Sequence, residues 1–383
     1  MTESACCRFC GGAFHLPALL EYAEAPQSAQ GFLDSLEQQD AVVDLKIFQC
    51  ERCGLVQHAL PPVNYYRDVI RAVAFSDEMG EFRVLQLSKW VKQYELSGKK
   101  ILEIGCGKGE YIELLAKAGA QSVSGLENSF DSVNFACQRG LDAKHGYLLP
   151  DMQNPWACKF DAFAIFSFIE HWPDLKGSLC ALHNLLTDGA PGLVEVPSFD
   201  FIIKNGLYSE FTTDHVYYFD EKTLRTVLEL TGFEVLRIES VWHNYILSAQ
   251  VRKRVPLVTD NFKKQQVHIV AQLHKFVGQF DAQDVVVWGA GHQALAIISL
   301  GSLRGKISHI VDSAGFKQQK YTPGTHLLIK GPDSLLLDLP KAIVIMAAAY
   351  SDEIARNIAQ KYSEVSHVAI LRENGLEIIK GGT

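Results

Sequence analysis

The feature that most constrains this chain of 383 residues is a glycine-rich turn between an apolar run and a helical segment. Residues 101–104 are apolar apart from one acid, and Gly105, Gly107 and Gly109 follow them. Residues 111–119 then show helical periodicity and end at a glycine. Glycine suits such a turn because the backbone bends sharply and a ligand must approach it closely. The pattern predicts a strand, a tight turn and a helix whose first N–H groups favour a polar or anionic ligand.

Length and charge limit the kind of protein. A chain this long exceeds one ordinary core, so we expect two or three domains. A net charge of −8 argues against nucleic-acid binding, which needs a basic face, although a local basic pocket for one small anion remains compatible. The first residues lack the basic start and apolar core of a signal peptide, and no apolar run reaches the ~18 residues of a membrane span. We therefore expect a cytoplasmic protein with no membrane partner, a small-molecule substrate, and a monomeric or weakly dimeric state.

Two matched cysteine motifs mark the N-terminal segment. Cys7 and Cys10, and later Cys50 and Cys53, each form a C-x-x-C pair followed by glycine. The two-residue spacer lets both thiolates of a pair face one ion, so the two pairs predict a structural four-sulfur zinc site. Buried core cysteines or a redox pair are the alternatives. We expect residues 1–80 to form a zinc-binding domain that depends on its metal, since so short a segment has little core of its own.

Residues 81–255 alternate between strand and helix patterns. Ser76 can cap a first helix whose apolar face would include residues 82, 85, 87, 90, 91 and 94. Alternation of this kind predicts an α/β fold with a doubly wound sheet and ligands at the carboxyl ends of its strands. The expected strands after the glycine turn are residues 122–127, 161–168, 192–197, 233–238 and 245–251.

The spacing of the glycines indicates which cofactor binds. The turn reads G-x-G-x-G rather than the G-x-G-x-x-G of dinucleotide sites. Glu103 precedes it within the first strand, and Glu127 ends the second strand, where a carboxylate can accept hydrogen bonds from a ribose diol. Together with Phe168 after the fourth strand, this set resembles the first motif and following acid of class I methyltransferases, which use S-adenosylmethionine (SAM).

Two histidines are candidate catalytic residues. His171 follows Glu170 after the fourth strand, and His215 follows Asp214 on a loop before a helix that Asp220 can cap. A neutral imidazole near pH 7 can accept a proton, and a neighbouring carboxylate can favour its charged form. The alternative for each histidine is a packing role among aromatic residues.

Residues 256–383 repeat the alternating pattern. Gly289, Gly291 and Ala294 fit G-x-G-x-x-A after a strand, and Asp312 ends the next strand. On these motifs alone the domain would bind a nucleotide, conceivably NAD. The basic and polar loop at residues 317–326 suits a diphosphate. The alternative is a structural doubly wound domain whose glycines only permit packing.

Taken in order, these motifs resemble the sugar C-methyltransferases of deoxysugar pathways. Those enzymes have a zinc-binding N-terminal domain, a class I SAM methyltransferase domain and a C-terminal Rossmann-like domain. The match covers nearly the whole chain and includes residues 7–11, 50–56, 103–109, 169–171, 195–200, 214–219 and 317–326. The resemblance implies a nucleotide-linked 4-keto-6-deoxysugar substrate, methylated at the carbon beside its ketone, as in the nucleotide-deoxysugar C-3-methyltransferases.

The resemblance also implies residue roles. His215 would be the base, Asp214 would orient it, and His171 and Tyr66 would stabilise the enolate. The C-terminal domain would bind the nucleotide-sugar without NAD through Lys317, Lys320, Thr325 and His326.

This sequence departs from the family near the expected substrate pocket. The acid before the base is Asp214 rather than the usual glutamate, and Thr212 stands where the family has a tyrosine. The strand at residues 243–247 lacks the family's glycines. Two alternatives stay open: a methyltransferase of the same architecture that acts on oxygen, nitrogen or another sugar carbon, and a non-enzymatic zinc- and nucleotide-binding scaffold.

Overall fold

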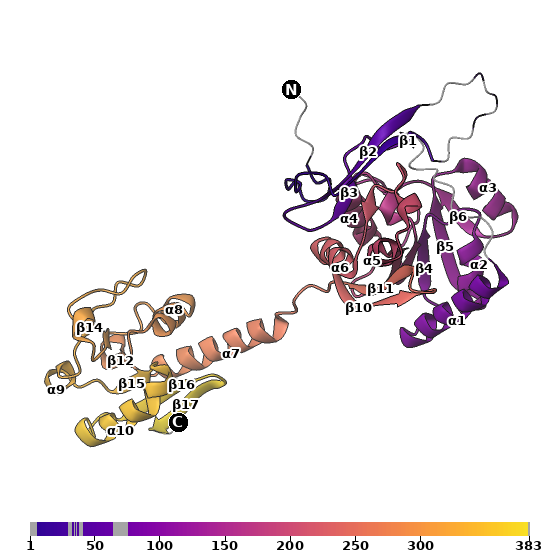
Figure 1. Cartoon of the computed structure of the whole chain (residues 1–383). Helices are drawn as coiled ribbons and strands as arrows, with labels where there is room; N and C mark the ends of the chain where they lie inside the picture. Colours follow the sequence, from indigo (N-terminus) through magenta and orange to yellow (C-terminus); the bar gives the residue numbers. More distant parts are fainter. Residues whose placement is uncertain are drawn as a thin grey trace. The chain divides into compact units, whose positions relative to one another are not determined.

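The structure is a computed structural model that describes residues 6–29, 33, 35, 37, 41–63 and 76–381. The chain forms two compact units, Met1–Pro256 and Leu257–Thr383, each with its own sheets and core (Figure 1). Tyr66, expected to stabilise an enolate, lies outside the described residues.

A small antiparallel sheet forms the N-terminal part of the first unit. Its strands are β1 (Leu20–Pro26), β2 (Val42–Gln49) and β3 (Val56–His58). The fourth strand, β9 (Tyr217–Tyr218), comes from much later in the chain and pairs with β3, giving the order β1-β2-β3-β9. The N-terminal segment is therefore built into the central part of the chain rather than standing beside it.

The large sheet of the first unit carries the glycine turn. Its order is β10-β11-β8-β7-β4-β5-β6, with the first two strands antiparallel and the other five parallel. The expected strands are all present, and the sequence analysis missed only the short polar edge strand β6 among them. The bounds are β4 Lys100–Ile104, β5 Ser122–Glu127, β6 Asp142–His145, β7 Ala162–Phe166, β8 Pro191–Pro197, β10 Phe233–Val241 and β11 Ile246–Lys253.

Helices cover both faces of this sheet because the buried residues of its strands alternate between two clusters. Leu102 and Ile165 belong to the cluster that holds α4 and α6, while Ile101 and Ala164 belong to the cluster that holds α1 and α2. The expected caps are confirmed, since the side chains of Ser76 and Asp220 accept hydrogen bonds at the starts of α1 and α6. The helices are α1 Asp77–Gln93, α2 Glu110–Lys117, α3 Phe130–Gln138, α4 Leu175–Leu185, α5 Phe199–Lys204 and α6 Glu221–Leu230, with short 3-10 turns η1 Ile169–His171 and η2 Tyr208–Glu210.

The buried face of α1 differs from the expected one. Leu85 is 58% exposed, whereas Arg83 is only 2% exposed and forms an ion pair with the fully buried Glu195 of β8. Gln86 donates a second hydrogen bond to the Glu195 carboxylate, at 2.6 Å. The expected burial of Leu87, Trp90 and Val91 is confirmed, whereas that of Leu85 was wrong. The buried Arg83 was missed because a search for apolar periodicity does not detect a charged pair.

The second unit is another α/β layer structure. Its sheet has the order β14-β13-β12-β15-β16-β17, parallel except for the last strand. The strands are β12 Val285–Trp288, β13 His309–Val311, β14 Ile329–Lys330, β15 Ala342–Ile345, β16 His367–Arg372 and β17 Gly375–Lys380. The helices are α7 Asp260–Val277, α8 His292–Leu300, α9 Ser334–Leu337 and α10 Ser351–Lys361, with 3-10 turns η3 Ala282–Asp284, η4 Gly315–Lys317 and η5 Ala348–Tyr350.

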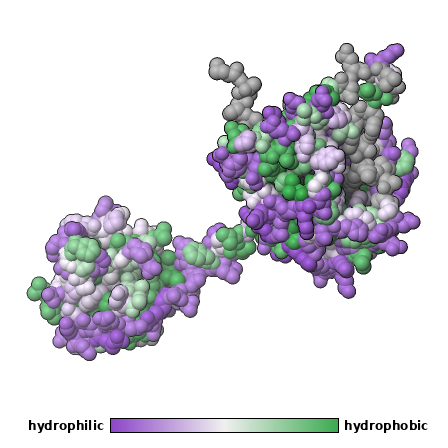
Figure 2. All heavy atoms as spheres, in the orientation of Figure 1, coloured by the Kyte–Doolittle hydropathy of each residue, from purple (hydrophilic) through white to green (hydrophobic). Residues whose placement is uncertain are grey.

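The first half of α7 leaves apolar side chains exposed. Phe262 and Val267 are 72% and 69% exposed, and apolar residues appear between hydrophilic ones along this helix in Figure 2. Its second half is buried in the core of the second unit through Leu273, Phe276 and Val277. Among the residues the structure describes, no helix has both the length and the apolar character needed to cross a membrane.

Candidate active site

The glycine turn after β4 has the geometry that a close-approaching ligand needs. Gly105 and Gly107 adopt left-handed backbone angles, with φ of 70° and 55°. A Cβ on Gly105 would lie 2.6 Å from the ring of Phe168, so a larger residue cannot fit there. A Cβ on Gly107 would meet nothing closer than the Glu110 carboxylate at 3.5 Å. Gly107 thus presents backbone to open space, while Gly105 is fixed by the aromatic wall opposite it.

Glu127 lies at the end of β5, beside this turn. Its carboxylate accepts hydrogen bonds from the backbone N–H of Gly107 at 2.9 Å and of Ser129 at 2.8 Å. These bonds fix the carboxylate where a ribose diol is expected. Glu103, on the neighbouring strand, is fully buried.

A small cleft lies at these strand ends, and it is lined by side chains of the kinds that SAM needs. Phe168, Tyr147 and Trp172 are aromatic and suit a nucleobase, and the Glu127 carboxylate and Gly105 line the same cleft. Sequence reasoning missed Tyr147 and Trp172, because an isolated aromatic residue gives no signal of its own. The cleft is lined by Ile104, Gly105, Leu126, Glu127, Asn128, Gly146, Tyr147, Leu148, Phe168 and Trp172.

His171 and His215 lie side by side, and one of them reaches the cleft wall. Their ring centroids are 4.8 Å apart in an edge-on arrangement, and the ring of His171 is 6.4 Å from that of Phe168. Glu170 joins them, since a carboxylate oxygen and one nitrogen of each ring all lie within 4.8 Å of one another. The structure therefore brings the two predicted histidines together next to the cleft lined by Phe168 and Glu127, which we call the methyl-donor cleft.

The tautomer of His171 follows from its partner. Nδ1 lies 2.9 Å from the backbone oxygen of Asp214. A carbonyl oxygen can only accept, so Nδ1 donates and Nε2 carries the lone pair when the ring is neutral. Asp214 thus orients His171 through its backbone oxygen, and its expected role in orienting His215 stays a prediction.

Burial sets the charge of His215. It lowers the pKa of this imidazole to about 4, so the ring is neutral near pH 7. The His215 ring also lies against Tyr218, with centroids 6.3 Å apart. The ring of His215 thus packs among aromatic rings, and its role as a base stays a prediction.

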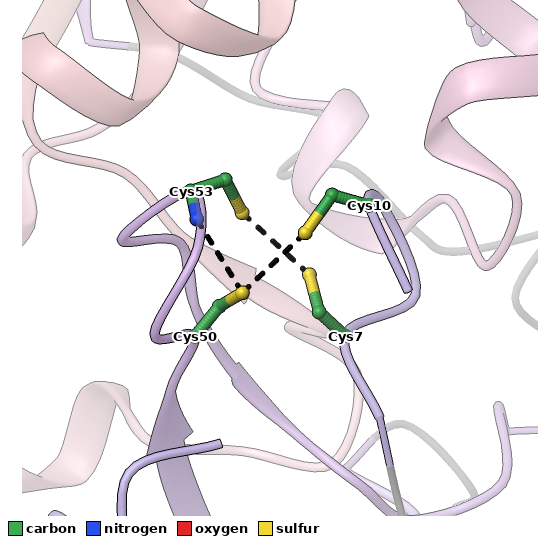
Figure 3. Close-up of side chains that lie close together, drawn as sticks. All are labelled: Cys7, Cys10, Cys50 and Cys53. Atoms are coloured by element: carbon green, nitrogen blue, oxygen red, sulfur yellow. Dashed lines mark hydrogen bonds between the residues drawn. The ribbon is translucent and has the colours of Figure 1, made fainter. Parts of the chain in front are cut away.

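The four cysteines of the N-terminal motifs converge. Their sulfur atoms all lie within 4.8 Å of one another and point to a common centre between the two loops (Figure 3). The Cys7–Cys53 and Cys10–Cys50 sulfurs are 3.7 Å and 3.4 Å apart. Zinc–sulfur bonds of about 2.3 Å in a tetrahedron place sulfurs ~3.8 Å apart, so this donor set fits zinc closely.

Gln57 of β3 contacts the cysteine cluster. Its side-chain amide donates to the sulfur of Cys7 at 3.1 Å, and its carbonyl oxygen accepts from the backbone N–H of Arg8 at 3.0 Å. Donors of this kind stabilise a thiolate ligand. No motif in the sequence pointed to Gln57, because the residue becomes significant only through the fold.

The second unit has a cavity of about 440 Å³ at the carboxyl ends of its parallel strands. Gly291 opens onto it, since a Cβ at that position would meet no atom within 4 Å, while a Cβ on Gly289 would meet the backbone oxygen of Met346 at 2.5 Å. Lys317 lines the cavity and pairs with Asp312 at 3.0 Å. Burial opposes ionisation of Asp312, but hydrogen bonds from Ala314, Lys317 and Ala290 hold its pKa below the ordinary value.

The other residues of the predicted substrate loop do not line this cavity. Lys320 and His326 are exposed. Thr325 is buried, and its hydroxyl lies 2.7 Å from that of Thr322, within the loop. Of the four predicted residues, the structure brings only Lys317 to the cavity.

Comparison with known proteins agrees with this architecture. Residues 79–238 match a family model described as a methyltransferase domain, and residues 254–370 match one described as a C-methyltransferase C-terminal domain. C-methyltransferase NovU from Streptomyces niveus is 23% identical over 356 residues, which cover 83% of each chain.

Other matches are shorter or weaker. A ubiquinone biosynthesis O-methyltransferase from Actinobacillus pleuropneumoniae is 34% identical over 88 residues, 21% of this chain and 37% of that enzyme. The crystal structure of magnesium protoporphyrin IX methyltransferase from Synechocystis PCC 6803 with bound SAH is 18% identical, covers 50% of this chain and 97% of that one, and has a TM-score of 0.39.

The comparisons and the geometry lead to one class of enzyme. The methyltransferase model spans the sheet that carries the glycine turn and Glu127, and the C-terminal model spans the second unit. The relative over most of both chains is a C-methyltransferase. This chain is a SAM-dependent methyltransferase whose second unit matches the model of a C-methyltransferase C-terminal domain.

Proposed function

We propose that the enzyme methylates the carbon beside the ketone of a nucleotide-linked 4-keto-deoxysugar, with His215 as the base. The observation that carries this proposal is the pair of histidines beside the methyl-donor cleft, with the His215 ring held neutral by burial. The similarity to a C-methyltransferase over most of the chain supports transfer to carbon.

The chemistry needs a base because a C–H bond must break before carbon can attack. A proton beside a ketone is acidic enough for an imidazole, which takes it while the electron pair stays behind as an enolate. SAM would supply an electrophilic methyl group, whose bond to sulfur breaks as the carbon–carbon bond forms, so that S-adenosylhomocysteine is the leaving group. His215 holds the abstracted proton at a ring nitrogen and afterwards releases it to solvent.

His171 is proposed to stabilise the enolate oxygen. Its Nδ1 donates to the Asp214 backbone oxygen, so a contact with the enolate would come from the Nε2 side of the ring. The proposed contribution of Tyr66 comes from a segment outside the described residues.

The nucleotide diphosphate is proposed to bind at the cavity of the second unit, with Lys317 as its main cation. The ammonium group lines the cavity and needs only to exchange the Asp312 carboxylate for a phosphate oxygen. Lys320, Thr325 and His326 remain weaker candidates, since they lie off the cavity. We expect no saturable NAD binding.

Hydrogen exchange tests the enolate step. The full-length enzyme is incubated with dTDP-linked 4-keto-6-deoxyglucose in deuterated water, and exchange of the protons beside the ketone is followed by NMR. We expect enzyme-dependent exchange that His215→Ala abolishes and that His268→Ala, on the exposed part of α7, leaves intact. Methyl transfer without any exchange would favour an O- or N-methyltransferase instead.

A further inference from the structure

The loop that carries Asp214 and His215 is held from the N-terminal sheet. Strand β9 follows His215 directly and pairs with β3, so that Gln57 lies opposite Tyr217 and Val56 opposite Tyr218. On the other side, the backbone N–H of Val216 donates to the backbone oxygen of Glu170 at 2.8 Å. The catalytic loop is therefore fixed between the methyltransferase domain and the N-terminal sheet.

One residue of β3, His58, contacts both ends of this loop. Its backbone N–H donates to the Val216 oxygen at 3.3 Å, and its ring Nε2 lies 3.1 Å from the Thr213 oxygen. Thr213 and Val216 directly flank Asp214 and His215. The two contacts span the dipeptide and restrict its backbone on each side.

The ring of His58 is in a fixed state. Its Nδ1 accepts the backbone N–H of Leu60 at 3.2 Å, so Nε2 must carry the proton that is donated to Thr213. The residue is fully buried, and removing either partner would leave a buried polar group unpaired.

We propose that His58 is a positioning residue. From strand β3 of the N-terminal sheet, it fixes the position of the base His215. Gln57, the preceding residue on the strand, holds the Cys7 sulfur, while His58 holds the catalytic loop. Successive strand residues face opposite sides, so β3 connects the two sites. The inference rests on the proposed role of His215.

The test compares variants of the full-length enzyme in the deuterium-exchange assay. His58→Phe keeps a ring of similar size without its hydrogen bonds, and we expect exchange to fall about 10- to 100-fold, as misplacing a catalytic group does. SAM affinity by calorimetry should not change. His58→Gln, whose amide can reach Thr213, should restore most of the rate.

A control variant separates positioning from general damage. A wild-type exchange rate in His58→Phe, or an equal loss in the control, would overturn the proposal. The matched control is His309→Phe in the second unit, which removes another buried histidine whose pKa burial lowers to about 4.

A substrate-independent readout keeps this test distinct from the proposed function. Histidine-labelled protein reports the pKa of His215 by NMR titration, with the resonance assigned by its loss in His215→Ala. Release of the loop in His58→Phe should raise this pKa from about 4 toward its ordinary value. An unchanged pKa would contradict positioning even if exchange never depended on His215. If His58→Phe does not fold, His58→Asn replaces it in the comparison with His58→Gln, because the asparagine amide is too short to reach Thr213.

Discussion

At the scale of single residues, the state of His215 predicts the pH dependence of the reaction. An ordinary histidine base with a pKa near ~6.5 loses activity below neutrality. Burial lowers the pKa of His215 to about 4, so the neutral base persists well below that point. We expect the exchange rate to be nearly equal at pH 5.5 and pH 7.5. A several-fold decrease at pH 5.5, in protein still folded by circular dichroism, would argue against His215 as the base.

Gly105 gives a second prediction at this scale. Gly105→Ala would place a methyl group 2.6 Å from the Phe168 ring and should weaken SAM binding at least about tenfold, because the aromatic wall must move. Gly140→Ala is the matched control, since Gly140 also has a positive φ but no atom within 4 Å of its Cβ. Both should lose roughly 1–2 kcal/mol from backbone strain. Equal SAM affinities by calorimetry would contradict the prediction.

The sequence predicted residues whose role depends on local motifs. The cysteine pairs, the glycine turn and the caps at Ser76 and Asp220 are each recognisable within a few positions. His58 and Gln57 carry no such pattern, because the contacts that define their roles are distant in the sequence, such as that between His58 and Thr213, 155 residues away. Asp214 shows the same limit, as its backbone rather than its carboxylate makes the contact with His171.

At the scale of elements, the pair that anchors α1 to β8 should dominate the stability of that contact. Arg83→Met leaves the Glu195 carboxylate buried without its ion pair, and such losses cost roughly 3–5 kcal/mol. Arg139→Met breaks an ion pair with Glu113 that is about one-third exposed, and should cost less than about 1 kcal/mol. Urea denaturation of both variants measures the difference. Equal losses of unfolding free energy in the two variants would show that burial does not determine how much each ion pair contributes.

The cysteine cluster predicts a metal-dependent element. We expect one zinc ion per chain by atomic absorption, and its loss in Cys50→Ser, which removes one of four converging sulfurs. Cys180→Ser is the control, because that exposed cysteine lies outside the cluster. Equal zinc contents in the two variants would contradict the assignment.

Strands were predicted correctly where they are long and apolar. They were missed where they are short and polar, or where their partner strand lies far away in the sequence. The strands of the large sheet were recognisable as buried runs, whereas β6 has four residues of which only Ala143 is buried. β9 has two residues and exists only because β3 supplies its partner. Nothing near Tyr217 in the sequence could reveal that pairing.

At the scale of the whole molecule, each unit carries a buried histidine that is neutral. These residues are His58 in the first unit and His309 in the second. Burial lowers both pKa values to about 4, while unfolded chains protonate near ~6.5. Between these two pKa values the unfolded state therefore binds more protons than the folded state. The free energy of unfolding decreases as the pH is lowered through this range. Linkage gives a loss of roughly 2 kcal/mol per histidine at pH 5.

Thermal unfolding from pH 7.5 to pH 5 measures this loss in both units. His309→Phe should reduce the pH dependence of the second unit and leave that of the first unchanged. A melting profile that does not respond to pH above 5 would contradict the assignment of these histidines as neutral.

The pairing of β9 with β3 also bears on how the chain folds as it is made. All four cysteines lie within the first 53 residues, so metal can bind long before Tyr217 and Tyr218 leave the ribosome. Until then the outer edge of β3 has no neighbouring strand, and an unpaired edge invites association with other chains. Nascent chains halted before β9 should therefore be the aggregation-prone species, even with zinc in place. A graft of the N-terminal sheet onto another methyltransferase would therefore need β9 as well as β1, β2 and β3.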